Sequence, residues 1–157
     1  MTEGDLPRVH TWLAEPHVAE FWSAEPGELE AILRADEPAH AFIASADAMP
    51  IAYLQTYRID DHPEYAAHVA VGADAAGVDM FIGEPAFAHR GLGAPLLAQF
   101  VAEIVWPVTA ARTCWIGPAA DNPRAIRAYA KAGFEYVKTV HIPGEGQPEY
   151  LMRLVRG

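Results

Sequence analysis

The residues best suited to chemistry form a short glycine-containing segment in the second half of the chain. The segment reads Ala88-His89-Arg90-Gly91-Leu92-Gly93-Ala94. It lies between a predicted strand and a predicted helix, where backbone N–H groups converge at the positive end of the helix dipole and can bind a pyrophosphate. It contains neither the Walker lysine pattern nor the GxGxxG spacing of dinucleotide folds, so it favours other phosphate-bearing ligands. A tight strand-to-helix turn with no ligand would also explain it.

A single carboxylate interrupts an aliphatic segment. Asp79 stands within Gly77-Val78-Asp79-Met80-Phe81-Ile82. A buried carboxylate costs free energy unless a cation pairs with it, and an incoming ammonium group would supply that pair. The same carboxylate could then accept a proton from the ammonium group. The alternative is an aspartate on an edge strand that faces solvent.

A third feature is the segment 122–134, which has the signals of a complete helix. Asp121 or Asn122 can cap it, Pro123 suits its first turn, and Gly133 suits the position just after its end. Tyr129 would lie on its apolar face. A tyrosine with its ordinary pKa near 10 is protonated at neutral pH and can act as a general acid, although an aromatic residue at this spacing is more often part of a core.

These residues must be positioned by a mixture of helices and strands. Apolar spacing predicts helices over 6–13, 27–34, 91–106 (stopped by Pro107) and 123–132. Alternation and apolar runs predict strands over 39–46, 51–59, 78–83, 113–117, 134–141 and 149–155, with a turn at Met49-Pro50. Residues 60–74 are polar and are interpreted as a surface loop. This order predicts an α/β or α+β sheet with helices packed on it.

Composition and length limit the class of protein. The chain has 157 residues, of which 52% are apolar and 20% charged, enough for one domain with a contiguous core. Its N-terminus has no signal-peptide pattern and no apolar run reaches the ~20 residues of a membrane span, so a cytoplasmic protein is expected. The single cysteine, Cys114, excludes a disulfide scaffold and is interpreted as a buried apolar residue. The seven histidines show no ligand spacing, so no metal is expected.

The charge is unevenly distributed. Residues 1–87 carry 16 acidic and three basic residues, a net −13, whereas residues 88–157 carry five acidic and eight basic residues, a net +3. The acidic half makes nucleic acid an improbable partner. A cationic substrate on one half and an anionic cofactor on the other would suit this polarity, but an acidic surface kept for solubility would suit it too.

The glycine-containing segment 88–94 and the helical segment 122–134 together resemble the signatures of the GNAT superfamily of N-acetyltransferases. Arg90-Gly91-Leu92-Gly93-Ala94 is similar to its acyl-CoA pyrophosphate loop. Asn122…Ala125-Ile126…Tyr129…Lys131-Ala132-Gly133-Phe134 is similar to its second signature. The aminoglycoside 6′-N-acetyltransferase branch is the most similar, through the segments Asp5-Leu6-Pro7…Trp12-Leu13…Pro16-His17-Val18…Phe21-Trp22, Ile51-Ala52-Tyr53-Leu54-Gln55-Thr56-Tyr57 and Gly77-Val78-Asp79.

The resemblance implies a single GNAT domain over 1–157, with a mixed, mostly antiparallel sheet, a splayed strand pair and flanking helices. It implies acetyl-CoA as cofactor, bound by the backbone of Met80, Phe81 and Ile82, by the segment from Ala88 to Ala94, and by Asn122, Arg124 and Tyr129. It also implies Asp79 as the residue that binds and deprotonates the acceptor amine, Tyr129 as the general acid, and the Phe81 N–H as the oxyanion donor.

For the acceptor itself, Trp22, Tyr53, Gln55, Tyr57 and Asp79 are the candidate binding residues. An aromatic wall with a few polar groups suits a polyhydroxylated amine, and alternation places Tyr53, Gln55 and Tyr57 on one face of their strand. Asp60, Asp61, Glu64 and Asp74 could form an acidic rim. The acceptor is expected to be a small-molecule amine, and the protein a monomer or homodimer.

Three departures from the family pattern are present. Members usually begin with a strand before the segment matched by residues 2–5, and this chain starts at Met1. Ala88 stands where Gln or Arg is common. Gly117-Pro118 stands where the branch often has an Asp-Pro that helps to bind the aminoglycoside.

The leading hypothesis is an acetyl-CoA-dependent N-acetyltransferase that acts on a small cationic amine, with an aminoglycoside 6′-amine as a candidate. The alternatives are a siderophore-biosynthesis N-acyltransferase, which Asp79 disfavours, and a non-catalytic acyl-CoA-binding or sensor protein.

Overall fold

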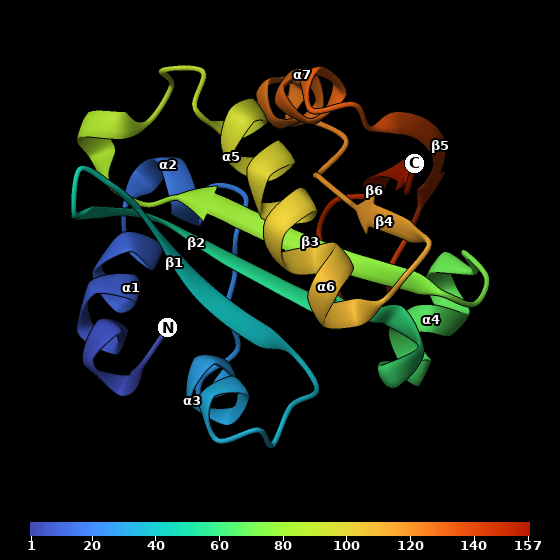
Figure 1. The fold of residues 1–157 in the computed structure, drawn as a ribbon, viewed down its shortest axis with the longest axis horizontal. Coiled ribbons are helices and arrows are strands. Elements are labelled where there is room, and N and C mark those ends of the chain that lie inside the picture. Colours follow the sequence, from blue (N-terminus) through green and yellow to red (C-terminus); the bar gives the residue numbers. More distant parts are fainter. The chain divides into compact units, whose positions relative to one another are not determined.

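The strands of the chain form one six-stranded sheet. A computed structural model describes residues 1–157 and gives the strand order β1-β2-β3-β4-β6-β5. The strands are β1 (His40–Ala46), β2 (Met49–Arg58), β3 (Ala75–Ile82), β4 (Thr113–Ile116), β5 (Glu135–Val140) and β6 (Glu149–Val155). The β3–β4 pair is parallel, whereas β4–β6 and β5–β6 are antiparallel. A mixed α/β sheet is therefore confirmed, with all six predicted strands present (Figure 1).

The chain divides into two compact units that share strands β2 and β3. Unit 1 comprises Met1–Gln55 and Met80–Leu92, and unit 2 comprises Thr56–Asp79 and Gly93–Gly157. Each unit is described separately below. No helix is long and apolar enough to cross a membrane.

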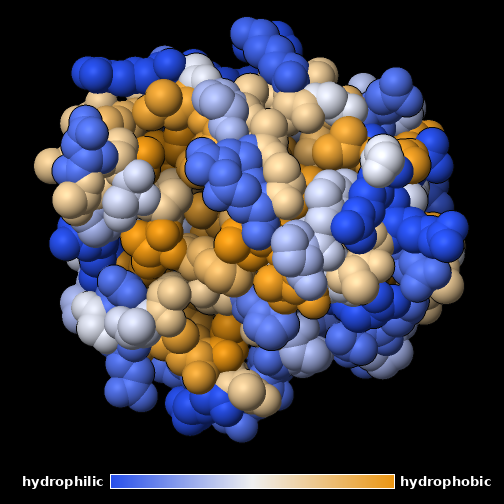
Figure 2. All heavy atoms as spheres, viewed as in Figure 1, coloured by the Kyte–Doolittle hydropathy of each residue, from blue (hydrophilic) through white to orange (hydrophobic).

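Unit 1 is built from three helices and a hairpin. The helices are α1 (Leu6–Leu13), α2 (Pro16–Ala19) and α3 (Glu28–Leu33), and short 3-10 turns occur at Glu3–Asp5 and Pro85–Phe87. Val9, Trp12, Leu29 and Tyr53 form its core. Apolar side chains also reach the surface near β1, where Ala41 and Ile43 are partly buried (Figure 2).

The turn of the β1–β2 hairpin differs from the prediction. Met49 and Pro50 belong to β2, and the turn is made by Asp47 and Ala48, both with positive φ. Two consecutive residues with positive φ match the right-handed twist of the flanking strands, which a Met-Pro pair could not do because proline fixes φ near −65°.

Unit 2 contains a helix that the sequence analysis interpreted as a loop. Within the segment 60–74, α4 (Pro63–Val69) follows a 3-10 turn at Ile59–Asp61. Val69 is fully buried against Ile59, Trp115 and Leu151. The polar composition of this segment is thus the exposed face of a short helix whose apolar residues lie on the sheet.

The helix predicted over 91–106 is also divided differently. It consists of α5 (Gly93–Phe100), a π-helical segment (Val101–Val105) and α6 (Trp106–Thr109). Pro107 does not stop it, because it lies in the first turn of α6, where a missing backbone N–H is tolerated.

The last helix, α7 (Pro123–Lys131), agrees with the predicted signals. Asn122 is its cap, with Oδ1 accepting a hydrogen bond from the Ala125 N–H at 3.1 Å. Gly133 follows its end with φ of +97°. A Cβ at Gly93 would lie 3.6 Å from that of Ala128, so the start of α5 packs closely on α7 (Figure 1).

Candidate active site

Asp79 lies among tyrosines and a second carboxylate in unit 2. Tyr57 on β2 forms a side-chain hydrogen bond with Asp79. The charge of Asp79 also acts on Tyr65 of α4, Tyr129 of α7 and Glu149 of β6. Four elements thus present titratable side chains to one partly exposed carboxylate on β3.

Tyr129 is buried, with 9% of its surface exposed. Burial raises the pKa of its hydroxyl well above the ordinary value, and the nearby charge of Asp79 raises it further. Its hydroxyl therefore stays protonated across the physiological range. A protonated phenol that senses the charge of a carboxylate can serve as a proton donor beside a proton acceptor.

Tyr57 is held by a close approach to the backbone of β3. A Cβ placed on Gly77 would overlap the Tyr57 ring, so the absence of a side chain at Gly77 makes room for the ring. The ring also meets His62 edge-on, with 4.8 Å between centroids. Burial, followed by the charge of Asp79, raises the pKa of Tyr57 well above its usual range. Tyr57 is therefore a neutral hydrogen-bonding group next to Asp79.

Glu149 and Tyr65 are candidate site residues that the sequence analysis missed. The Tyr65 hydroxyl donates a hydrogen bond to Glu149 Oε2 at 2.9 Å. Burial raises the pKa of Glu149 to about 7, the Tyr65 hydrogen bond opposes this, and the charges of Asp79 and Glu145 add to it. Tyr65 falls in the segment interpreted as a loop. The only sequence signal for Glu149 was its place as the first residue of a predicted strand.

In unit 1, Phe81 belongs to an aromatic cluster that includes two of the predicted acceptor-binding residues. Its ring stacks on Tyr53 with 5.4 Å between centroids and meets Trp22 edge-on at 5.0 Å. Tyr53 is fully buried and donates a hydrogen bond to Gln55 Oε1 at 2.7 Å. The structure thus brings Trp22, Tyr53, Gln55 and Phe81 together, with Tyr53 in the core. Tyr57 lies in unit 2.

The glycine-containing segment runs from Ala88 to Leu92 at the end of unit 1 and continues as Gly93 and Ala94 at the start of α5 in unit 2. His89 and Gly91 have φ of +61° and +74°. A Cβ at Gly91 would meet nothing within 4 Å. The backbone at His89 and Gly91 is thus curled and exposed, as the sequence analysis expects of an anion-binding segment.

Three further residues predicted to bind the cofactor lie at or near the surface or at the start of a helix. Arg90 and Arg124 are exposed, while Asn122 caps α7. His17 of α2 donates from Nε2 to the carbonyl oxygen of Ile82 at 2.9 Å. Its ring lies edge-on to that of His89, with 6.1 Å between the ring centroids. Through these two contacts α2 packs against the end of β3 and the segment that follows it.

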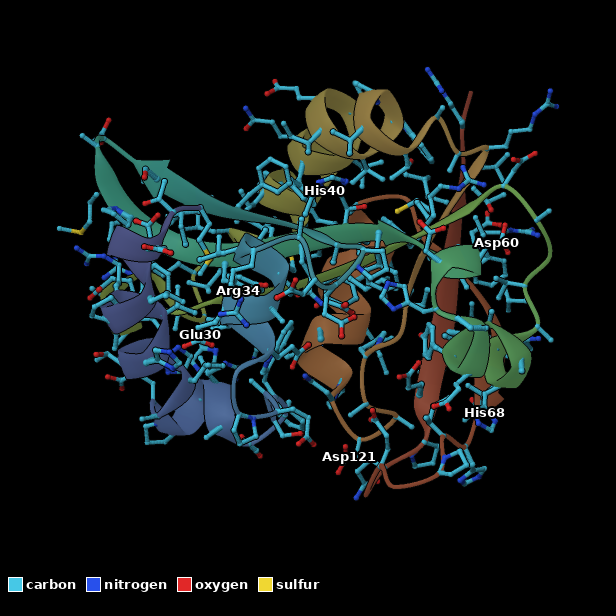
Figure 3. The ribbon with its side chains drawn as sticks, turned by 90° about the horizontal axis from the view of Figure 1, so that it is seen from below. Glu30, Arg34, His40, Asp60, His68 and Asp121 are labelled. Carbon is cyan, nitrogen blue, oxygen red and sulfur yellow. The ribbon has the colours of Figure 1, made fainter.

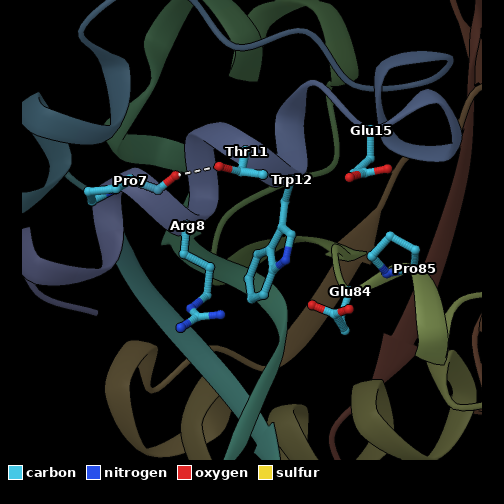
Figure 4. A pocket seen from close by; sticks show the side chains of 7 residues that line it. All are labelled: Pro7, Arg8, Thr11, Trp12, Glu15, Glu84 and Pro85. Atoms are coloured by element: carbon cyan, nitrogen blue, oxygen red, sulfur yellow. Dashed lines mark hydrogen bonds between the residues drawn. The ribbon is translucent and has the colours of Figure 1, made fainter.

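A pocket of about 490 Å³ in unit 1 adjoins the aromatic cluster, because the ring of its lining residue Trp12 meets Phe81 edge-on at 6.5 Å. Its lining residues are Pro7, Arg8, Thr11, Trp12, Glu15, Glu84 and Pro85 (Figure 4). None of the predicted site residues is among them. The indole of Trp12 forms its wall and is packed so tightly against Gly83 that a Cβ there would overlap it.

The proposed acidic rim is partly neutralised within unit 2. Arg58 lies 3.7 Å from Asp60 and 3.5 Å from Asp74, and it donates a hydrogen bond to the Thr109 carbonyl at 2.9 Å. Figure 3 shows Asp60 beside the segment that leads into α4. Two of the four expected rim residues thus share a cation. No group of three or more His, Cys, Asp or Glu side chains is arranged to hold a metal ion.

Comparison with known proteins identifies the family. The protein-family model described as an acetyltransferase (GNAT) domain matches residues 1–142. The aminoglycoside N(6')-acetyltransferase type 1 of Klebsiella pneumoniae is 29% identical over an alignment of 163 positions, which covers 98% of this chain and 80% of that protein.

Solved structures agree. The aminoglycoside acetyltransferase AAC(6')-Ib in complex with coenzyme A and kanamycin is 27% identical, with a TM-score of 0.83 over 99% of this chain and 92% of that one. The aminoglycoside N(6')-acetyltransferase of Legionella pneumophila is 26% identical, with a TM-score of 0.74 over 99% and 88%. The predicted fold and enzyme class are confirmed: the chain belongs to the GNAT family of acetyltransferases.

Proposed function

We propose that this chain transfers an acetyl group from acetyl-CoA to a primary amine of a small polycationic acceptor, with the 6′-amine of an aminoglycoside as the first candidate. The observation that carries the proposal is the grouping of Asp79 with the protonated hydroxyls of Tyr57 and Tyr129 in unit 2. Relatives that act on aminoglycosides support the choice of acceptor.

Acetyl-CoA, when bound, supplies the reactive thioester. The exposed, curled segment from Ala88 to Ala94 suits its pyrophosphate, and Arg90 and Arg124 suit its negative charge. Backbone groups of Met80, Phe81 and Ile82 on β3 would bind the pantetheine arm together with Asn122. The Phe81 N–H would donate a hydrogen bond to the acyl oxygen, on which negative charge develops during the transfer.

Asp79 has the two tasks that an acceptor amine imposes. Its carboxylate attracts the ammonium form and then accepts the proton that must leave before the nitrogen can attack. The hydroxyl of Tyr129 donates a proton to the departing sulfur. After the attack the nitrogen still carries one proton too many, and this proton replaces the one that Tyr129 gives to the sulfur. The products are then a neutral amide and a thiol, and Asp79 releases its proton to water.

Trp22, Tyr53, Gln55 and Tyr57 are proposed to shape the acceptor site. Tyr53 would act from within the core by fixing Gln55 through its hydrogen bond. Residues 1–157 would work as a single acetyltransferase domain, because the chain passes between the two units inside the shared strands β2 and β3. Since acetyl-CoA is a cytoplasmic metabolite, the cytoplasm is the proposed location.

The test is a thiol-release assay with acetyl-CoA and a panel of amines that includes kanamycin, spermidine and hydroxylysine. Turnover with kanamycin or spermidine is expected. Turnover with hydroxylysine alone would favour siderophore assembly, and binding of acetyl-CoA with no turnover on any amine would favour a sensor. Failure to bind acetyl-CoA would refute the proposal.

A further inference from the structure

A carboxylate from β6 occupies the space beside Gly117, the residue that follows β4. A Cβ built on Gly117 would lie 2.5 Å from Glu149 Oε2 and 3.1 Å from Glu149 Cδ. Real Cβ atoms do not approach an oxygen so closely, so any side chain at position 117 would displace the Glu149 carboxylate. The backbone fixes this arrangement, since the Tyr150 N–H donates to the Pro118 carbonyl at 2.8 Å and Ala119 bridges to Glu149.

The carboxylate is oriented by a neutral donor and has no cation. Oε2 accepts the hydrogen bond from Tyr65 at 2.9 Å. Glu149 forms no ion pair in this structure, although the site also contains Asp79. Two carboxylates in a partly buried site repel one another, and ammonium groups bound beside them relieve the repulsion and the cost of burial.

We infer that Glu149 binds a second ammonium group of the acceptor whose reacting amine is held by Asp79, so that this enzyme selects acceptors with at least two amines. The inference rests on the proposed function. It assigns specificity to a residue of β6 and makes Gly117 the position that admits it. Tyr65 becomes a positioning residue, because its hydroxyl directs Oε2.

A pH dependence of acceptor binding follows. Glu149 titrates with a raised pKa of about 7 and faces Tyr65 of α4, Tyr57 of β2, Asp79 of β3 and Glu145 of the loop before β6. The tyrosines stay neutral, so Glu149 gains its charge near neutrality. The KM for a dibasic acceptor should therefore fall between pH 6 and pH 8.

The test compares Glu149→Gln with the wild type in steady-state assays on kanamycin, spermidine and n-butylamine. Glu135→Gln, which changes an exposed carboxylate of β5 that does not act on Glu149, is the matched control. For Glu149→Gln, we expect the KM of the multibasic acceptors to rise at least tenfold, with kcat and the KM for acetyl-CoA within twofold of wild type. Turnover of n-butylamine should be unaffected, and the KM of the control should stay within twofold.

The outcomes separate the two proposals. Suppose that the wild type turns over amines. An unchanged KM in Glu149→Gln, or an equal loss of activity on n-butylamine and on spermidine, would then overturn the assignment of Glu149 and leave the proposed function standing. A wild-type enzyme that turns over no amine would overturn the proposed function and this inference with it. If Glu149→Gln fails to fold, Tyr65→Phe replaces it: a three- to fivefold rise in the KM of spermidine supports the inference, and a wild-type KM overturns it.

Discussion

Replacing Glu149 with glutamine is expected to stabilise the protein at pH 8 far more than at pH 5. Burial raises the pKa of Glu149 from its usual 4.5 to about 7. As the pH rises, the unfolded chain loses this proton first, so the native state is progressively destabilised between these two values. Below pH 4.5 the penalty is absent, and above pH 7 it is fully present. Glutamine carries no charge and still offers an oxygen to the Tyr65 hydroxyl.

The size of the effect follows from the shift. A change from 4.5 to about 7 corresponds to ~3.5 kcal/mol, at about 1.4 kcal/mol for each pKa unit. Because Glu149 is partly exposed, water screens part of this energy, and the gain in the free energy of unfolding should grow by about 1–2 kcal/mol from pH 5 to pH 8. Urea unfolding at both pH values measures it, with Glu135→Gln as control. A Glu149→Gln variant that is less stable than wild type at pH 8, or equally shifted at both pH values, would refute the burial argument.

Three further substitutions test the site. Asp79→Asn should lower turnover at least tenfold, because an amide accepts no proton; unchanged kinetics with a wild-type circular dichroism spectrum would contradict the role. Tyr129→Phe should slow the chemical step in single-turnover assays and leave the Kd for acetyl-CoA nearly constant. A rate equal to that of the wild type would show that Tyr129 has only a packing role. Gly77→Ala should lower the free energy of unfolding by about 1–3 kcal/mol, because its Cβ overlaps the Tyr57 ring. Urea unfolding beside Gly146→Ala, where a Cβ meets nothing, checks this, and equal stability of the two would show that the ring moves aside freely.

Elements with strong periodicity were predictable from sequence. The bounds of α1 and β6 agree with the predicted ones. Each presents one apolar face to the core of its own unit, through Val9 and Trp12 in one case and Leu151 in the other. Burial of such a face dominates the local energetics, so the pattern in the chain is sufficient.

Helix α4 was missed because its stability comes from distant residues. It is seven residues long, too short to show a clear period, and Trp115 and Leu151 of other strands cover its apolar side. The candidate site shows the same limit. Asp79 was indicated by its local setting and Tyr129 by the resemblance of its segment to the family signature, whereas Glu149 depends on Tyr65, 84 residues away in sequence. Only the pairing of β4 with β6 brings the Glu149 carboxylate next to Gly117.

The sole thiol of the chain also has a practical use. Cys114 lies on β4 with 0% of its surface exposed, and burial raises its pKa far above the ordinary range. Thiol reagents attack thiolates, so the folded protein adds no fast background to an assay that counts released coenzyme A. Labelling of Cys114 requires transient opening of the structure around β4, and its rate therefore reports the free energy of that opening. The labelling rate of this one cysteine thus measures local opening in the unit that contains Asp79 and Tyr129.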